Sequence, residues 1–131
     1  MRFIVPSVLI LVAAIHALPV MGVIGAAKLS QLYGITVQDP SLELLLRHRA
    51  LLFGLLAAFL AYAAVRPELH RMALVAGFAS VVSFLVLAQP TFSLNTALVT
   101  VVRVDWLALA LLIVGAIAHF RGPAMTSANA R

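Results

Sequence analysis

Long apolar stretches alternate with short polar breaks along this chain. Apolar side chains dominate residues 3–27, 42–65, 69–89 and 96–120, where they cover every face of a helix and not a single stripe. About 20 apolar residues in a helix span the hydrocarbon core of a bilayer, which is about 30 Å thick. The pattern therefore predicts four membrane-spanning helices.

Proline, glycine and helix-capping residues mark the breaks between these helices. We expect a kink near Pro19, because proline lacks the N–H group and crowds the preceding turn. Residues 28–35 either finish the first helix or lie at the membrane interface, with Gly34 as a suitable helix end. Asp39 or Ser41 is a suitable cap for the second helix. The later breaks fall at Arg66-Pro67-Glu68, Pro90 and Gly122-Pro123.

Short connections make neighbouring helices antiparallel, so the predicted fold is an all-α four-helix bundle with up-down topology. Residues 1–131 are expected to form a single transmembrane domain with a flexible tail over 121–131. A rival interpretation of the N-terminus is a cleaved signal peptide with small residues near Ala14 and Ala17. The apolar run extends well past the usual length of such a region, which favours a retained helix.

Small residues recur at helical spacing within the apolar stretches. Gly22 and Ala26, and likewise Gly54 and Ala58, have the four-residue spacing that lets helix backbones approach closely. An alanine-rich sequence also produces such spacings by chance. We expect these faces to point into the bundle.

Composition supports a lipid environment. Of the 131 residues, 64% are hydrophobic and 10% are charged, and the mean hydropathy is +1.14. Soluble domains are nearer half apolar and a quarter charged. The net charge of +5 would suggest nucleic acid in a soluble protein, but in a membrane protein basic residues set topology and meet anionic lipid. No nucleic-acid partner is therefore expected.

The chain has no cysteine, which excludes thiol redox chemistry, disulfides and cysteine-ligated metals. No nucleophile–base pair, glycine-rich phosphate loop or pair of catalytic carboxylates is visible either. These absences favour a role that is not enzymatic.

Basic residues are divided between the two sides of the predicted bundle. The side with both termini holds Arg2, Arg66, Arg71, Arg121 and Arg131. The opposite side holds Lys28, together with three arginines that lie within predicted helices, namely Arg47, Arg49 and Arg103. If the bundle holds those three, the positive-inside rule places both termini in the cytoplasm.

The second and fourth helices begin on the same, non-cytoplasmic side, so their charged residues lie at similar depth. Glu43 and Arg47 are one turn apart and are expected to pair. Arg49 points elsewhere on the helix, and its expected partner is Asp105, because a charge in a membrane span costs a few kcal/mol. The candidate ligand-binding residues are Glu43, Arg47, His48, Arg49, Arg103, Asp105 and His16.

Three interpretations of this cluster remain open. The structural one is an ion-paired lock between the second and fourth helices, with other arginines snorkelling to headgroups. The functional one is an outward-facing polar pocket, in which arginine binds an anionic or polar ligand. The third is a proton or ion path. The chain has only four acidic residues, and this small number argues against such a path.

The histidines give no clear cofactor site. His16 is expected to hydrogen-bond a backbone carbonyl or a hydroxyl such as Ser80 or Ser83, although a ligand or proton-handling role is the alternative. Haem needs two facing histidines at one depth, and the nearest match, His70 with His119, lies shallow beside arginines. No spacing typical of a metal site occurs. We predict no cofactor and no metal.

One region resembles a known family. The segments Leu32-Tyr33-Gly34-Ile35, Asp39-Pro40 and the run from Leu45 to Leu56 are similar to the first loop and second helix of the DoxX-like superfamily of small bacterial four-helix membrane proteins. Arg49-Ala50, Gly54 and Asp105 are the matching positions. The resemblance implies a four-helix bundle in the bacterial inner membrane. Some relatives are associated with quinone-linked sulfur oxidation or oxidative-stress complexes, but without cysteine this chain is not expected to share sulfur chemistry.

These features favour a small binding or accessory subunit of the inner membrane that uses the polar cluster. The alternatives are a small oligomeric transporter or channel and a quinone- or lipid-handling oxidoreductase subunit. The expected partners are membrane lipid and either a second copy of the chain or a larger membrane protein.

Overall fold

The computed structural model describes residues 3–90 and 93–121. The helices and 3₁₀ helices (η) are α1 (Ile4–Ala17), η1 (Leu18–Ile24), α2 (Ala26–Tyr33), α3 (Pro40–Ala64), η2 (Pro67–Leu69), α4 (His70–Ala88) and α5 (Thr96–Arg121). The flexibility predicted for the tail concerns residues 122–131, which lie outside the described residues.

The described part of the chain is all helical and contains four segments long and apolar enough to cross a membrane. They are Ile4–Ile24, Pro40–Ala64, Pro67–Ala88 and Thr96–Arg121. The predicted all-α bundle of four candidate spanning helices is confirmed, and it makes the chain a multi-pass membrane protein by helix length and composition.

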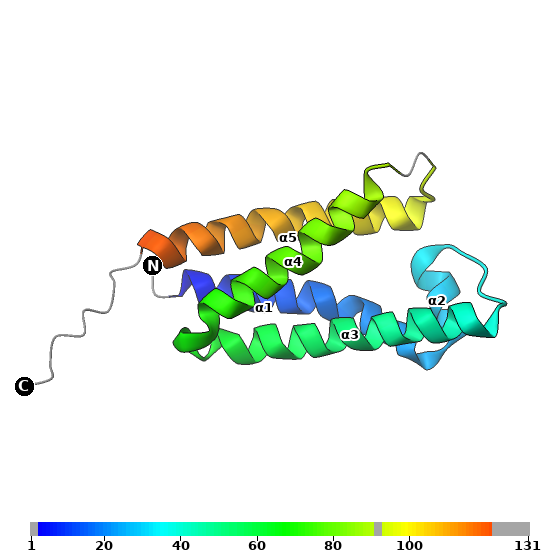
Figure 1. The fold of residues 1–131 in the computed structure, drawn as a ribbon, viewed down its shortest axis with the longest axis horizontal. Helices are drawn as coiled ribbons and strands as arrows, with labels where there is room; N and C mark the ends of the chain where they lie inside the picture. The colour runs from blue at the N-terminus through cyan, green and yellow to red at the C-terminus, as the bar shows by residue number, and fades with distance from the viewer. Residues whose placement is uncertain (1–2, 91–92, 122–131) are drawn as a thin grey trace, which may run out of the picture.

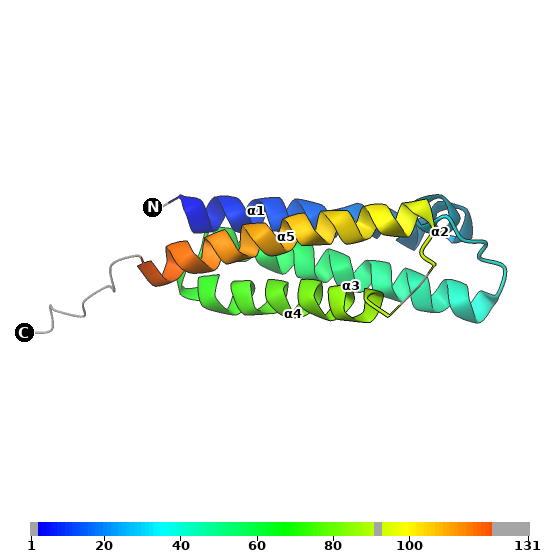
Figure 2. The same ribbon diagram turned by 90° about the horizontal axis from the view of Figure 1, so that it is seen from above.

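The four long segments run alternately up and down, so the two ends of the described chain lie at the same end of the bundle (Figure 1). α1 and α5 lie side by side, with α3 and α4 along their other faces (Figure 2). Fully buried apolar side chains fill the centre, among them Leu9, Val12, Leu60, Val81 and Leu112. The outward faces are also apolar, as a lipid-facing surface requires, with exposed Leu11, Leu51, Val75 and Ile113.

The first spanning segment is not one continuous helix. α1 ends at Ala17, the Leu18 N–H donates to the Ile15 carbonyl, and the chain tightens into η1. Pro19 explains the change, because it cannot donate the next α-helical hydrogen bond. Gly25 then adopts φ = 147°, a conformation that L side chains rarely adopt, and the chain turns into the separate helix α2. α1 and η1 together form the first candidate spanning segment, Ile4–Ile24, and the irregularity predicted near Pro19 is confirmed.

The predicted helix ends around the first connection are confirmed. Gly34 closes α2 in the left-handed conformation (φ = 63°), and its N–H donates to the Ser30 carbonyl. Asp39 caps α3, with Oδ1 accepting from the Ser41 N–H at 2.6 Å and from the Leu42 N–H at 3.1 Å. These two ends fix the length of the connection that returns the chain to the bundle.

Some of the small residues let elements approach closely. A methyl group added at Gly22, Gly54 or Gly77 would come within 2.7, 3.2 and 2.9 Å of Leu29, Val20 and Leu112, respectively. The expectation that these glycines face neighbouring elements is confirmed. Ala58, by contrast, is exposed, and the break at Gly25 prevents Gly22 and Ala26 from sharing a helix face.

The cap of α3 predicts a specific acid sensitivity. The N–H groups of Leu42 and Ser41 donate to the Asp39 carboxylate and lower its pKa below the ordinary 3.8. The cap therefore stabilises the fold above pH 3.8, and this contribution is lost as the pH falls through the lowered pKa. Asp39→Asn keeps an uncharged cap, so its melting temperature in detergent should fall less than that of the wild type between about pH 4 and about pH 2. Parallel melting curves for the two proteins over that range would contradict the assignment.

Candidate functional site

A cavity of about 190 Å³ lies where α1 gives way to η1, near the end of the bundle opposite the termini. Its walls come from α1, η1, α2, α3 and α5. The lining residues are Ile15, His16, Leu18, Pro19, Leu32, Tyr33, Arg49, Phe53, Thr100, Val101, Val104 and Asp105. Most of this wall is apolar, and the charged groups Arg49 and Asp105 reach it from different helices.

Arg49 is held by aromatic rings. Its guanidinium carbon lies 5.0 Å from the centre of the Phe53 ring, 5.3 Å from that of Tyr33 and 5.7 Å from that of Phe84. Such cation–π contacts contribute about 0.5–2 kcal/mol each, with the larger values in desolvated surroundings. The rings thus stabilise a cation that has left water.

The expected ion pair between Arg49 and Asp105 is not formed. Among the described residues, the ion pairs within 4.0 Å are Arg47–Glu43 and Arg66–Glu68. Asp105 lines the cavity on α5 and still lies within electrostatic range of Arg49. Arg49 and Asp105 each lie nine residues into their helix, about 14 Å along its axis and well inside the span. The two opposite charges thus line one cavity from different helices.

His16 is buried, with 4% of its surface exposed, and both ring nitrogens have partners. Nδ1 lies 2.9 Å from the Val12 carbonyl and therefore donates to it, while Nε2 lies 3.2 Å from the Ser80 hydroxyl and shares a hydrogen bond with it. The predicted backbone-carbonyl and Ser80 contacts are confirmed. These two contacts fix the orientation of the imidazole at the cavity wall.

Tyr33 brings the end of α2 to the cavity. Only 5% of its surface is exposed, and its buried hydroxyl has no hydrogen-bond partner among the described residues. A buried hydroxyl without a partner costs about 1–3 kcal/mol. The hydroxyl also has almost no accessible surface, so Tyr33 contributes to the cavity wall without presenting this group to it.

Asn95 fixes the backbone of Tyr33. Its Nδ2 donates to the carbonyls of Tyr33 (2.8 Å) and Gly34 (3.1 Å), and its Oδ1 accepts from the Leu98 N–H (2.9 Å). One side chain thus satisfies the end of α2 and caps the start of α5. This contact joins α2 to α5, two walls of the cavity that are distant in sequence.

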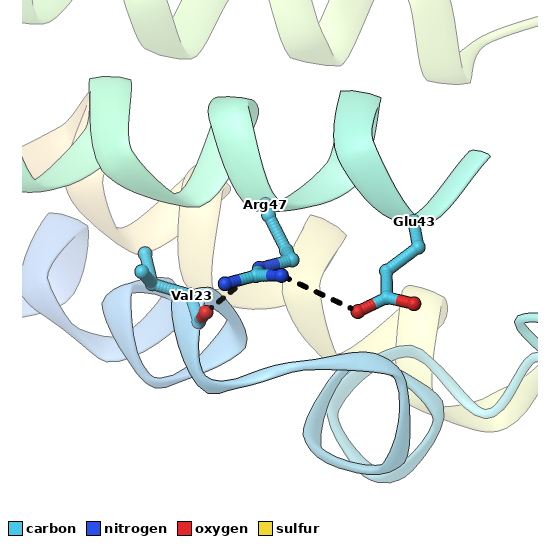
Figure 3. Close-up of polar contacts among 3 residues, drawn as sticks. All are labelled: Val23, Glu43 and Arg47. Carbon is cyan, nitrogen blue, oxygen red and sulfur yellow. Dashed lines mark hydrogen bonds and ion pairs between the residues drawn. The ribbon is translucent and has the colours of Figure 1, made fainter. Parts of the chain in front are cut away.

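Glu43 and Arg47 form a separate contact outside the cavity. Their side chains pair at 3.6 Å, as predicted, and the Arg47 Nε donates to the Val23 carbonyl at 2.9 Å (Figure 3). Val23 lies in the last turn of η1, where backbone carbonyls lack helical partners. Arg47 therefore attaches η1 to α3, and both elements contribute to the cavity wall.

The other candidate residues lie apart from the cavity. His48 and Arg103 are exposed and do not line it. Of the seven residues proposed from sequence, the cavity brings together His16, Arg49 and Asp105. His70 and His119 face each other with ring centres 6.4 Å apart, on the helix ends that lie near the termini. No group of three potential metal ligands occurs within residues 3–90 and 93–121.

Sequence reasoning missed four residues of this region: Tyr33, Phe53, Phe84 and Asn95. Tyr33 belongs to residues 28–35, for which the expectation is a helix end or an interfacial segment, and neither phenylalanine is predicted to be part of the site. One signal was available, because Arg49 and Phe53 are four residues apart and must share a helix face. Asn95 immediately before a predicted helix start was a second signal, typical of an N-cap.

Comparisons with protein-family models, curated proteins and solved structures find no match to this chain. The resemblance to the DoxX-like superfamily is therefore not supported, and the chain stands as a small all-helical protein with four long apolar helices.

Asn95→Ala should loosen α2 and lower the free energy of unfolding by about 1–3 kcal/mol, because it removes a helix cap and two further hydrogen bonds. Hydrogen exchange in detergent should become faster at the amides of α2. Thr96→Ala is the matched control, since the Thr96 side chain makes no hydrogen bond within the described residues. Equal exchange rates in α2 for the two variants would show that Asn95 does not hold this wall.

Proposed function

We propose that this chain is a small binding protein of the bacterial inner membrane that holds a small molecule in the cavity between α1, α2, α3 and α5. The observation that carries the proposal is the separation of Arg49 and Asp105. Two opposite charges line one cavity within the span, yet no ion pair within 4.0 Å joins them.

The cost of burying charge supports this choice over a structural lock. A charged side chain inside a membrane span costs a few kcal/mol, and direct pairing is the simplest way to offset that cost. Here aromatic rings offset the cost of burying the Arg49 guanidinium, and the Asp105 carboxylate lies on the cavity wall. This arrangement keeps both groups available to a molecule placed between them.

We further propose that both termini face the cytoplasm. Arg66, Arg71 and Arg121 lie at the terminal end of the bundle, in agreement with the positive-inside rule. The cavity is then in the outer half of the membrane. A reporter enzyme fused to either end of the chain reads this orientation directly.

The binding role is tested by filling the cavity. Val104 lines it, whereas Val114 on the same helix is exposed on the bundle surface. The wild type, Val104→Phe and Val114→Phe should be purified in discs of native lipid, and their small-molecule content compared by mass spectrometry. We expect a compound retained by the wild type and by Val114→Phe and depleted from Val104→Phe, with unchanged helix content by circular dichroism. The same small-molecule content in all three proteins would contradict a binding role for the cavity.

A further inference from the structure

We infer that the cavity takes a neutral, hydroxyl-bearing aromatic ring, that is, a single-ring phenol. This inference rests on the proposed binding function and adds the chemical class of the ligand. Four features of the cavity carry it: size, aromatic walls, charge balance and hydrogen-bonding groups.

The cavity has the size of one substituted ring. Its volume is about 190 Å³, and an apolar cavity of about 150 Å³ is large enough to bind benzene. The cavity is therefore large enough for a benzene ring with small substituents.

The walls favour an aromatic occupant. The rings of His16, Tyr33 and Phe53 all contribute to the lining. Aromatic rings attract one another in offset or edge-to-face arrangements, worth about 0.5–1.5 kcal/mol beyond the buried area. A saturated ring of the same size lacks this contribution.

Charge balance selects a neutral occupant. Arg49 and Asp105 bring one positive and one negative charge to the lining. A carboxylate ligand would place a second negative charge near Asp105, and an amine would place a second positive charge near Arg49. A neutral molecule leaves the pair balanced.

The polar groups select a hydroxyl. Arg49 supplies hydrogen-bond donors, and the Asp105 carboxylate supplies an acceptor. A phenolic hydroxyl accepts and donates through one oxygen, so it can meet both kinds of group.

The opening of the cavity suits the entry of such a molecule. The exposed members of the lining are Leu18 and Thr100, and η1 packs on α1, α2 and α3 but not on α5. The opening therefore lies at the side of the bundle between η1 and α5, where the surface meets lipid. Small neutral phenols dissolve in lipid, whereas a carboxylate is largely excluded from it.

The test compares four probes of similar size on the full chain in lipid nanodiscs, with empty nanodiscs subtracted. They are p-cresol, toluene (no oxygen), 4-methylcyclohexanol (no aromatic ring) and p-toluate (an anion). Saturation-transfer NMR and calorimetric titration measure binding. We expect p-cresol to bind about tenfold more tightly than toluene, as the loss of one hydrogen bond to a charged group implies. We also expect it to bind more tightly than 4-methylcyclohexanol, which lacks the aromatic contacts, and p-toluate, which carries a second negative charge.

Val104→Phe is the decisive variant, because its added ring fills part of the space in which the proposed phenol lies. We expect it to weaken p-cresol binding about tenfold. Val114→Phe, on the exposed surface of the same helix, is the control and should bind like the wild type.

Each contrary outcome overturns a defined part of the proposal. Tighter binding of p-toluate, or equal binding of toluene or 4-methylcyclohexanol, overturns the phenol class and leaves the binding function standing. An unchanged p-cresol affinity in Val104→Phe places the bound p-cresol outside this cavity and overturns the phenol class. If no probe binds, the phenol class fails, and the binding function fails with it only if Val104→Phe also retains the wild-type small-molecule content.

Discussion

An arginine inside a lipid-facing bundle must be stabilised without bulk water, and the surroundings of Arg49 are built around this constraint. Tyr33, Phe53 and Phe84 offer ring faces to its guanidinium from three different helices. Because the rings stabilise the Arg49 guanidinium, Asp105 need not form an ion pair with it. The cavity exists because the charge is compensated by aromatic faces and not by a carboxylate.

The local backbone of the first 40 residues makes this arrangement possible. Pro19 ends α1, η1 moves away from α5, and Gly25 and Gly34 allow α2 to bring Tyr33 back to the bundle. Two polar contacts then fix this path of the chain: Arg47 holds Val23 to α3, and Asn95 holds Tyr33 to α5. Each contact satisfies a carbonyl at a helix end that lipid could not satisfy.

The sequence was sufficient to predict the four spanning helices, since a helix of about 20 residues that is apolar on every face suits lipid and not water. It also predicted the Asp39 cap, the Glu43–Arg47 pair and the hydrogen bonds of His16, which depend on local spacing or a single facing hydroxyl. The sequence did not predict the cavity. Whether Arg49 meets Asp105 or three rings depends on the path of α2, and that path depends on a backbone reversal at Gly25 that no periodicity indicates. For the same reason Arg103 and His48 were grouped with Arg49, although they are exposed on other faces.

The central claim is that the region between Arg49 and Asp105 is an open cavity and not a packed lock. The absence of native cysteine allows a direct measurement with single-cysteine variants. Val101 and Ala108 lie seven residues apart on nearly the same face of α5, but Val101 lines the cavity and Ala108 is fully buried in the packed core. With methyl methanethiosulfonate on the protein in lipid, Val101→Cys should be modified rapidly and Ala108→Cys only at background rate. Equal protection of the two cysteines would contradict the account.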